Sequence, residues 1–305
     1  MNLPEYIISP LAALLLSPLL AGIINRTKAF FAGRKGQHLF QVYFDLARLF
    51  RKDYVFSKTT SWIFRVSPVI IFTATLASTC FVPFISSGTR ISFAGDLVLM
   101  LYLLALARFF LIISALDTGS SFEGMGASRE AFFSVMTEPV IFTCLLSIMR
   151  ANGTVSITEA LSAPMLSDSI SVLLSALPLF FVLLAENSRI PFDDPNTHLE
   201  LTMIHEVMIL DNSGPGLGLL EYSASVKLWL FSLILGRILL PSTGMSPFVQ
   251  TLILLAIMGL IAVVIGTVES VMARIRLIKV PQMLFGAGVA ALLGFFINVT
   301  KAIPW

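Results

Sequence analysis

Long uncharged apolar stretches are the feature of this sequence that most limits what it can fold into. One of them, ISVLLSALPLFFVLLA at 170–185, holds sixteen residues without an ionisable side chain. Hydrophobic residues make up 56% of the 305-residue chain and charged residues only 12%, whereas ordinary soluble domains carry about 25% charged residues. Runs of roughly 20 apolar residues are typical of helices that cross a membrane. The short alternating segments of a membrane β-barrel are not seen, so we expect an all-α polytopic membrane protein.

The apolar stretches predict about eight transmembrane helices in a single integral membrane domain covering residues 1–305. In the first span the positive charges of Arg26 and Lys28 follow the apolar run. A secretory signal has the opposite order, so this span is expected to be retained. The predicted spans are residues 5–26, 62–85, 95–115, 131–150, 169–186, 221–240, 247–270 and 281–299.

The distribution of lysine and arginine predicts the orientation of these spans. If the loops after the first, third, fifth and seventh spans face the cytoplasm, fourteen of these residues lie on that side and four on the other. Cytoplasmic loops are the ones enriched in positive charge. Both termini are therefore predicted to lie outside.

An amphipathic segment occupies the first and longest cytoplasmic loop. Apolar side chains recur at helical spacing from Leu39 to Phe50, with Asp45 and Arg48 on the other face. This pattern is typical of a helix that lies along the membrane interface. It predicts either an anchor or a docking surface for a soluble partner.

A cluster of acids follows the fifth span, in AENSRIPFDDPNTHLELTMIHEVMILD at 185–211. Asp194 can cap a helix that begins with Pro195, and we expect this helix to continue to about Leu210. Glu200 and Asp211 would then lie on nearly the same face, about 16 Å apart. Water or intermediate groups would be needed to pass a proton between them.

Ionisable residues within the spans gather in the cytoplasmic half. Arg108 and Glu138 are both expected about 10 Å below the cytoplasmic surface, where an unpaired charge is costly, so we predict that they pair. We expect the outer half of the spans to hold almost no ionisable residue apart from Arg237. This asymmetry predicts a proton route that enters from the cytoplasm, reaches mid-membrane and leaves sideways into a neighbouring subunit. Its predicted members are Arg108, Glu138, Glu186, Glu200, Glu206, Asp211, Lys227 and Glu269.

The sequence predicts no metal site in this chain. Cys80 and Cys144 lie alone within apolar runs, so neither an iron–sulfur nor a zinc site is expected. His198 and His205 are seven residues apart, but two ligands do not make a metal site.

Three motifs resemble one known family. AENSRIPFD, GSSFEGMGASREAFFSVMTEP and GRKGQHLFQVYFDLARLFRKD are similar, in order and spacing, to motifs of the complex I membrane subunit 1 family, which bears the quinone site. The segments ALDTGSSFEGMGASRE and ESVMARIRLIKVP are closest to the membrane subunit of formate hydrogenlyase and related energy-converting [NiFe] hydrogenases. Gln37 stands where complex I has proline, and PNTHLELTMIHE lacks the early acids of its P-E-A-E-A-E-L. Both differences favour the hydrogenase branch.

This resemblance implies a non-catalytic subunit that anchors a hydrogenase module in a prokaryotic cytoplasmic (inner) membrane and couples electron transfer to proton or sodium movement. The implied partners are a hydrogenase-like large subunit, a small iron–sulfur subunit and antiporter-like membrane subunits. Those soluble partners would hold the [NiFe] centre and the iron–sulfur clusters, with no cofactor in this chain. The alternatives are a quinone-site subunit of a complex I-type oxidoreductase and a purely structural anchor. The positions matching the family's docking face are Arg34, Lys35, Arg129, Arg189 and Asp193.

Overall fold

The computed structural model describes residues 4–57, 59–85, 90–162, 169–193, 203–240 and 246–301, and within these ranges it is built from helices. Among the described residues, seven helical segments are long and apolar enough to cross a membrane. They correspond to α1 (Glu5–Phe31), α3 with η1 (Trp62–Ser78 and Thr79–Phe81), α4 (Asp96–Asp117), α5 (Ser121–Asn152), α9 (Gly214–Leu239), α10 (Pro247–Val271), and η2 with α11 (Leu277–Lys279 and Val280–Lys301).

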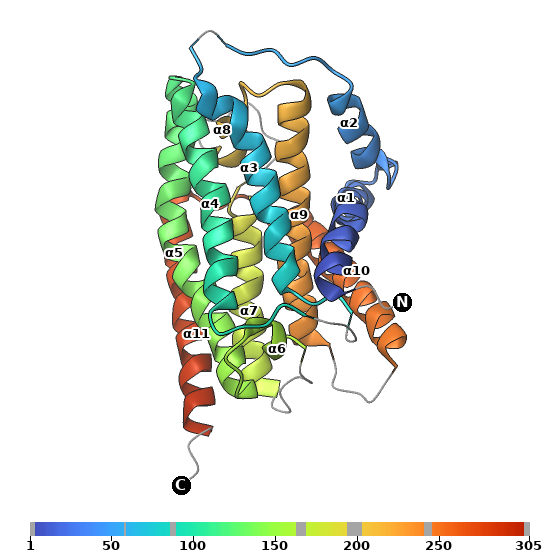
Figure 1. Ribbon diagram of the computed structural model, residues 1–305, viewed down its shortest axis with the longest axis vertical. Coiled ribbons are helices and arrows are strands. Elements are labelled where there is room, and N and C mark those ends of the chain that lie inside the picture. The colour runs from blue at the N-terminus through green and yellow to red at the C-terminus, as the bar shows by residue number, and fades with distance from the viewer. Residues whose placement is uncertain are drawn as a thin grey trace.

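The remaining predicted span is α7 (Ser169–Glu186), whose searched part, Leu173–Glu186, is a shorter apolar helix. An all-α polytopic fold is therefore confirmed. The first residues of α1 and the last residues of α11 lie at the same end of the molecule, as an even number of crossings requires (Figure 1).

Several helices continue beyond their predicted spans. The 32-residue α5 begins ten residues earlier than expected; at 1.5 Å per residue it is about 48 Å long, well above the roughly 30 Å of a bilayer core. Its polar first turns therefore extend past the hydrocarbon region. Figure 1 shows α2 and α8 at this same end of the bundle, which we call the inner end because it carries the predicted cytoplasmic loops.

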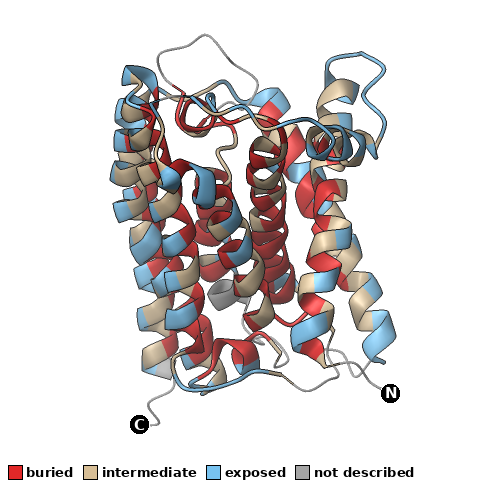
Figure 2. Cartoon of the chain, turned by 45° about the horizontal axis from the view of Figure 1, so that its top comes forward, coloured by how far each residue is buried: buried red, intermediate tan, exposed pale blue. Residues whose placement is uncertain are grey.

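The helix α9 forms the centre of the bundle. Most of its side chains are buried, and it packs against α1, α3, α7 and α10. Figure 2 shows buried residues concentrated on the middle helices and exposed ones on the outer helices. On the opposite flank α5 packs against α4, α7 and α11. The helices α3, α4, α5, α7 and α9 therefore form a ring in which each packs against the next.

The amphipathic segment forms α2 (Gln41–Phe50), which packs against α1 and α9. The hydroxyl of Tyr43 donates to the carbonyl of Leu15 at 2.5 Å, and that of Tyr222 donates to Leu14 at 2.6 Å. Pro18 has no N–H to offer the Leu14 carbonyl four residues earlier, so Tyr222 supplies the missing donor. The α1–α9 contact thus supplies a hydrogen bond to the Leu14 carbonyl that the proline leaves without its helical donor.

The predicted helix from Pro195 to about Leu210 is wrong for its described part. Residues 194–202 lie outside the described residues, and beyond them α8 spans only His205–Met208. The reason lies in Asp193, whose Oδ2 accepts the backbone N–H groups of Ile204 at 3.1 Å and His205 at 3.3 Å. The carboxylate takes the place of the i−4 carbonyls, so helical bonding cannot continue back through these residues.

The prediction of an almost empty outer half also needs correction. Asp96 is 0% exposed and Glu5 is 2% exposed, and both lie at the outer end, as the first residues of α4 and α1. Arg237 is buried there as well and donates from Nε to the carbonyl of Pro83 at 2.7 Å. The two ends of the bundle therefore both contain buried charge.

A buried charge cluster as candidate functional site

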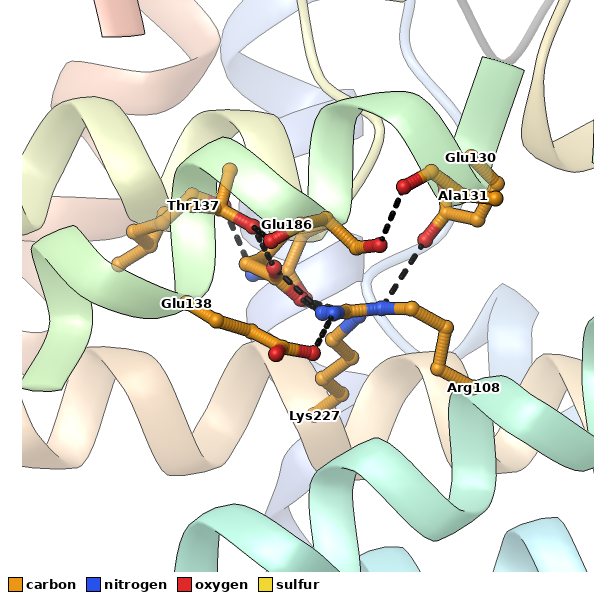
Figure 3. Close-up of polar contacts among 10 residues, drawn as sticks. Arg108, Glu130, Ala131, Thr137, Glu138, Glu186 and Lys227 are labelled. Carbon is orange, nitrogen blue, oxygen red and sulfur yellow. Dashed lines mark hydrogen bonds and ion pairs between the residues drawn. The ribbon is translucent and has the colours of Figure 1, made fainter. Parts of the chain in front are cut away.

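Arg108 lies at the centre of a cluster of charges on four helices. It projects from α4, is 8% exposed, and sits nine residues from the inner end of its helix, about 14 Å along the axis. Its Nη1 contacts Glu138 of α5 at 2.5 Å, and its Nη2 contacts both oxygens of Glu186 at 2.5 and 2.6 Å (Figure 3). The predicted Arg108–Glu138 pair is present, and Glu186 shares the same guanidinium.

Glu186 is the most fully satisfied carboxylate of the cluster. Besides Arg108 it accepts the hydroxyl hydrogen of Thr137 at 2.6 Å and lies 2.8 Å from Nζ of Lys227 on α9. Its side chain is 3% exposed. Such a buried acid remains ionised only because several donors compensate the lost hydration. The last residue of α7 is thereby tied to α4, α5 and α9.

Sequence reasoning missed one member of this cluster. Glu130 of α5 lies 3.4 Å from Nε of Arg108, and its side chain is 16% exposed (Figure 3). Glu130 precedes Thr137 by seven residues, two turns of helix, so both side chains lie on one face of α5. That spacing was available in the sequence, but the predicted span began at residue 131.

A small cavity connects this cluster to the inner end. Its volume is about 60 Å³, and its lining includes Arg108, Glu130, Glu186, Lys227 and His205. A liquid water molecule occupies about 30 Å³, so the cavity has room for one or two waters among charged partners. His205 belongs to α8, and its presence here joins the inner loop to the buried charges.

A second, larger hollow lies on the other side of the cluster. This groove between α4 and α5 has a volume of about 540 Å³ and is lined mainly by apolar residues, with Arg108, Glu138 and Glu186 at its polar part. Tyr102, Val135 and Phe142 line it and are themselves exposed. The side chain of Glu138 is 50% exposed. A half-exposed carboxylate deep in a membrane helix marks the place where the cluster reaches the lateral surface.

Two further ion-pair groups, one around Glu269 and one around Asp193, lie near the inner ends of α1, α7 and α10. Glu269 pairs with Lys28 at 2.8 Å and with Arg189 at 3.3 Å. Asp193 pairs with Arg274 at 2.7 Å. The structure thus places Glu269 in a network other than that of Arg108.

The predicted docking residues divide into exposed and buried ones. Arg34 and Lys35 are exposed and line an open hollow of about 610 Å³ with Lys28 and Gln37. Arg129 is half-buried and donates to the carbonyl of Met203 at 3.0 Å, while Arg189 holds Glu269. Asp193 was predicted to lie on the docking face, but it is only 1% exposed. Its carboxylate instead holds the backbone of the loop behind that face.

The acids of the inner loop are only partly within the described residues. Glu200 and His198 lie outside them. Glu206 is half-buried on α8, and Asp211 is exposed, with its backbone N–H donating to Glu123 of α5 at 3.1 Å. Gly126 allows this loop to approach α5, because a Cβ there would meet the Ile204 carbonyl at 2.9 Å. Neither Glu206 nor Asp211 lines the cavity beside Arg108.

The described residues contain no group of three or more histidine, cysteine, aspartate or glutamate side chains placed to hold a metal ion. The charges are instead arranged as ion pairs and hydrogen bonds between helices. The fold and the site thus define a class of protein. It is a multi-pass helical membrane protein whose charges form an internal network from a small inner cavity to a lateral groove.

Comparison with known proteins identifies the family. Residues 5–299 match the model of the family described as NADH dehydrogenase, and the chain belongs to that family. It is 30% identical over 298 residues to formate hydrogenlyase subunit 4 of Escherichia coli K12, covering 95% of this chain and 96% of that protein. It is 28% identical over 293 residues to hydrogenase-4 component C of the same organism, covering 93% and 92%.

The solved structure of an archaeal respiratory membrane complex, the membrane-bound sulfane sulfur reductase, contains a chain of the same fold. The TM-score is 0.83 at 18% identity, with 96% of this chain and 98% of that chain covered. The resemblance to the complex I membrane subunit 1 family and to its formate hydrogenlyase relatives is therefore confirmed.

Proposed function

We propose that this chain is the membrane-anchoring and ion-transfer subunit of an energy-converting [NiFe] hydrogenase or formate hydrogenlyase complex. The observation that carries the proposal is the continuous cluster from the His205 cavity, through Glu186 and Arg108, to the half-exposed Glu138. Charge displaced at the inner end has a chain of titratable partners leading to the side of the bundle. The similarity to formate hydrogenlyase subunit 4 supports the hydrogenase assignment.

Glu138 supplies the proposed lateral exit. Leaving a carboxylate half-exposed to lipid at this depth costs several kcal/mol, and a polar side chain from an adjacent membrane helix in the α4–α5 groove removes that cost. We therefore place an antiporter-like membrane subunit against this groove. Glu200, Glu206 and Asp211 are proposed as the inner approach to the route, with Lys227 inside it and Glu269 in the network beside it.

The soluble partners are proposed to dock at the inner end. The exposed Arg34 and Lys35 offer positive charge to a hydrogenase-like large subunit and its small iron–sulfur subunit, while Arg129 and Arg189 hold the surface behind them. Those partners would carry the metal centres. The chain is proposed to act as one integral domain over residues 1–305 of a prokaryotic inner membrane, with both termini outside.

Glu138→Gln is the direct test. The amide keeps the size of the side chain but cannot carry a proton, so we expect proton movement into proteoliposomes to be lost. Hydrogen evolution by the detergent-solubilised complex from reduced methyl viologen should remain. Glu159→Gln on α6 (Ile157–Ala160) is the matched control, because Glu159 is exposed at the outer end. Undiminished proton movement in the Glu138 variant would remove it from the route.

A second candidate is a quinone-site subunit of a complex I-type oxidoreductase. The observation in its favour is the similarity to NADH-ubiquinone oxidoreductase chain 1 of Chondrus crispus, 28% identical over 177 residues and covering 55% of this chain. Inhibition of the purified complex by quinone-site inhibitors would favour it. Insensitivity, together with hydrogen evolution, would favour the hydrogenase assignment.

A further inference from the structure

The cavity beneath α8 brings together ionisable side chains from five of the helices that line it. Arg108 comes from α4, Glu130 from α5, Glu186 from α7, Lys227 from α9 and His205 from α8. A smaller hollow next to it, about 20 Å³, is also lined by Glu130 and Glu186 and adds Asp193. Glu130 and His205 are the titratable groups of the first cavity that the proposed route does not yet use, and Asp193 of the second hollow pairs with Arg274.

With every group ionised, the cluster carries one more negative than positive charge, so it can take up one proton. Arg108 and Lys227 supply two positive charges, whereas Glu130, Glu138 and Glu186 supply three negative charges when all are ionised. In a buried site an uncompensated charge is expensive. One carboxyl of the three is therefore best placed to be protonated.

The contacts single out Glu130 as that carboxyl. Glu186 has two cations and a hydroxyl as partners, and Glu138 has a 2.5 Å contact with Arg108. Within the described residues Glu130 has only the 3.4 Å contact to Nε of Arg108, and that nitrogen makes no hydrogen bond there. With a side chain only 16% exposed, Glu130 has both the least compensation and little access to water.

His205 stands on the inner side of the same cavity. Its backbone N–H is held by Asp193, which also pairs with Arg274, so the position of its ring depends on the loop that faces the inner end. Burial and the positive charge of Lys227 lower the pKa of His205 to about 4. A neutral imidazole that lines a cavity of one or two waters can accept a proton on one ring nitrogen and release one from the other.

We propose that Glu130 is the residue that stores the exchangeable proton of this cluster and that His205 delivers the proton to it across the cavity water. The inference rests on the proposed ion-transfer function and names two carriers within it. The proton passes from the inner side to His205, then through water to the carboxylate of Glu130, which becomes a neutral carboxylic acid. When Glu130 releases the proton towards Glu138, the carboxylate is restored, and no electron is transferred in any of these steps.

The test is infrared difference spectroscopy of the whole complex during a pH change, since a protonated carboxyl has a C=O stretch that shifts in deuterium oxide. We expect the wild-type complex to show one such band from the cluster, which Glu130→Gln removes and Glu138→Gln retains. Glu130→Asp should move the band rather than abolish it, which keeps the test usable if the glutamine variant fails to assemble. Glu159→Gln is the control for the substitution itself.

The role of His205 is tested by the rate at which the same band exchanges with deuterium. His205→Gln retains a hydrogen-bonding side chain without a titrating ring, and we expect exchange to slow by about a hundredfold, the lower end of what a positioned acid–base group contributes. Unchanged exchange would overturn the delivery role. A band that persists in Glu130→Gln would overturn the storage role.

The two proposals fail separately. If Glu138→Gln stops proton movement but Glu130→Gln alters neither the band nor proton movement, the further inference is wrong and the function stands. If Glu138→Gln leaves proton movement intact, the proposed route fails, whatever the infrared band shows about Glu130.

Discussion

Buried carboxylates lie at both ends of the helical bundle, and they differ in the partners that hold them. At the outer end Asp96 accepts the backbone N–H groups of Leu97, Ile157 and Thr158 at 2.7, 2.8 and 3.2 Å, together with the hydroxyl of Ser156. Glu5 accepts the N–H groups of Phe84 and Ile85, both at 2.6 Å. These acids cap a helix and a loop, and backbone donors cannot take up or release protons at physiological pH.

The acids of the inner cluster are held mainly by side chains. Arg108 and Lys227 compensate Glu130, Glu138 and Glu186, next to a cavity on one side and a groove on the other. Side-chain ion pairs can exchange partners while the backbone stays in place. Burial of an acid alone therefore does not mark a proton-transfer site. An acid at such a site is held by ionisable side chains and has access to a cavity.

Removal of the central guanidinium should have the largest effect. In Arg108→Met three carboxylates lose their shared cation, and loss of one partner from a buried ion pair costs about 3–5 kcal/mol. We expect thermal unfolding at lower temperature and loss of proton movement together. Arg237→Met at the outer end is the comparison, and it should lower stability while the complexes that assemble still move protons, measured per assembled complex.

The pairing itself can be tested by exchange of the charges. Arg108→Glu combined with Glu138→Arg should restore part of the stability that each single change removes. Absence of any rescue would argue that Glu186 and Glu130, and not Glu138, fix the position of the guanidinium.

Asp96→Ala should come next in size. The substitution leaves the N–H groups of Ile157 and Thr158 at the start of α6 without acceptors. A buried donor without a partner lowers the free energy of unfolding by roughly 1–3 kcal/mol. The expected result is reduced assembly and a lower unfolding temperature, with proton movement per assembled complex unchanged. If the variant lost proton movement but kept normal stability, the claim that acids of the outer end have only a structural role would be wrong.

A smaller effect should appear in the pH dependence of stability. The folded protein lowers the pKa of His205 to about 4 from an ordinary value of 6.5, so the unfolded chain binds the extra proton more readily. The stabilising effect of a neutral His205 is present above pH 6.5 and is lost as the pH falls towards 4. Unfolding temperatures of wild type and His205→Gln, measured in detergent from pH 7.5 to 4.5, should converge as the pH falls.

Much of this arrangement was predictable from the sequence, because hydrophobicity and charge act over whole helices. The eight apolar stretches and the depth of Arg108 and Glu138 predicted the fold and the central ion pair. Glu130 was missed because it sits one residue before the predicted span, where an acid is ordinarily solvated. Asp96 and Glu5 lie inside predicted spans, but they are the first residues of their helices, where an acid is ordinarily solvated.

The inner loop was less predictable because a long-range contact decides its backbone. The capping residue and the apolar spacing at 194–210 favoured a continuous helix, but the carboxylate of Asp193 captures the N–H groups of Ile204 and His205. Local propensity is weak compared with a buried charge-assisted hydrogen bond. The resulting turn is what brings His205 to the cavity.

The smallest predicted effect concerns the two tyrosine hydroxyls that donate to backbone carbonyls of α1, where no ionised group takes part. Tyr222→Phe removes the donor to the Leu14 carbonyl that Pro18 leaves without a helical partner, and the expected loss of stability is about 1 kcal/mol. Tyr43→Phe, whose hydroxyl bonds the carbonyl of Leu15, should cost less, because Leu19, four residues on, has a backbone N–H to offer that carbonyl and Pro18 has none for Leu14. Thermal unfolding of both variants measures the difference, and neither should alter proton movement. A loss of proton movement in Tyr222→Phe would extend the functional region from the Arg108 cluster to the α1–α9 contact.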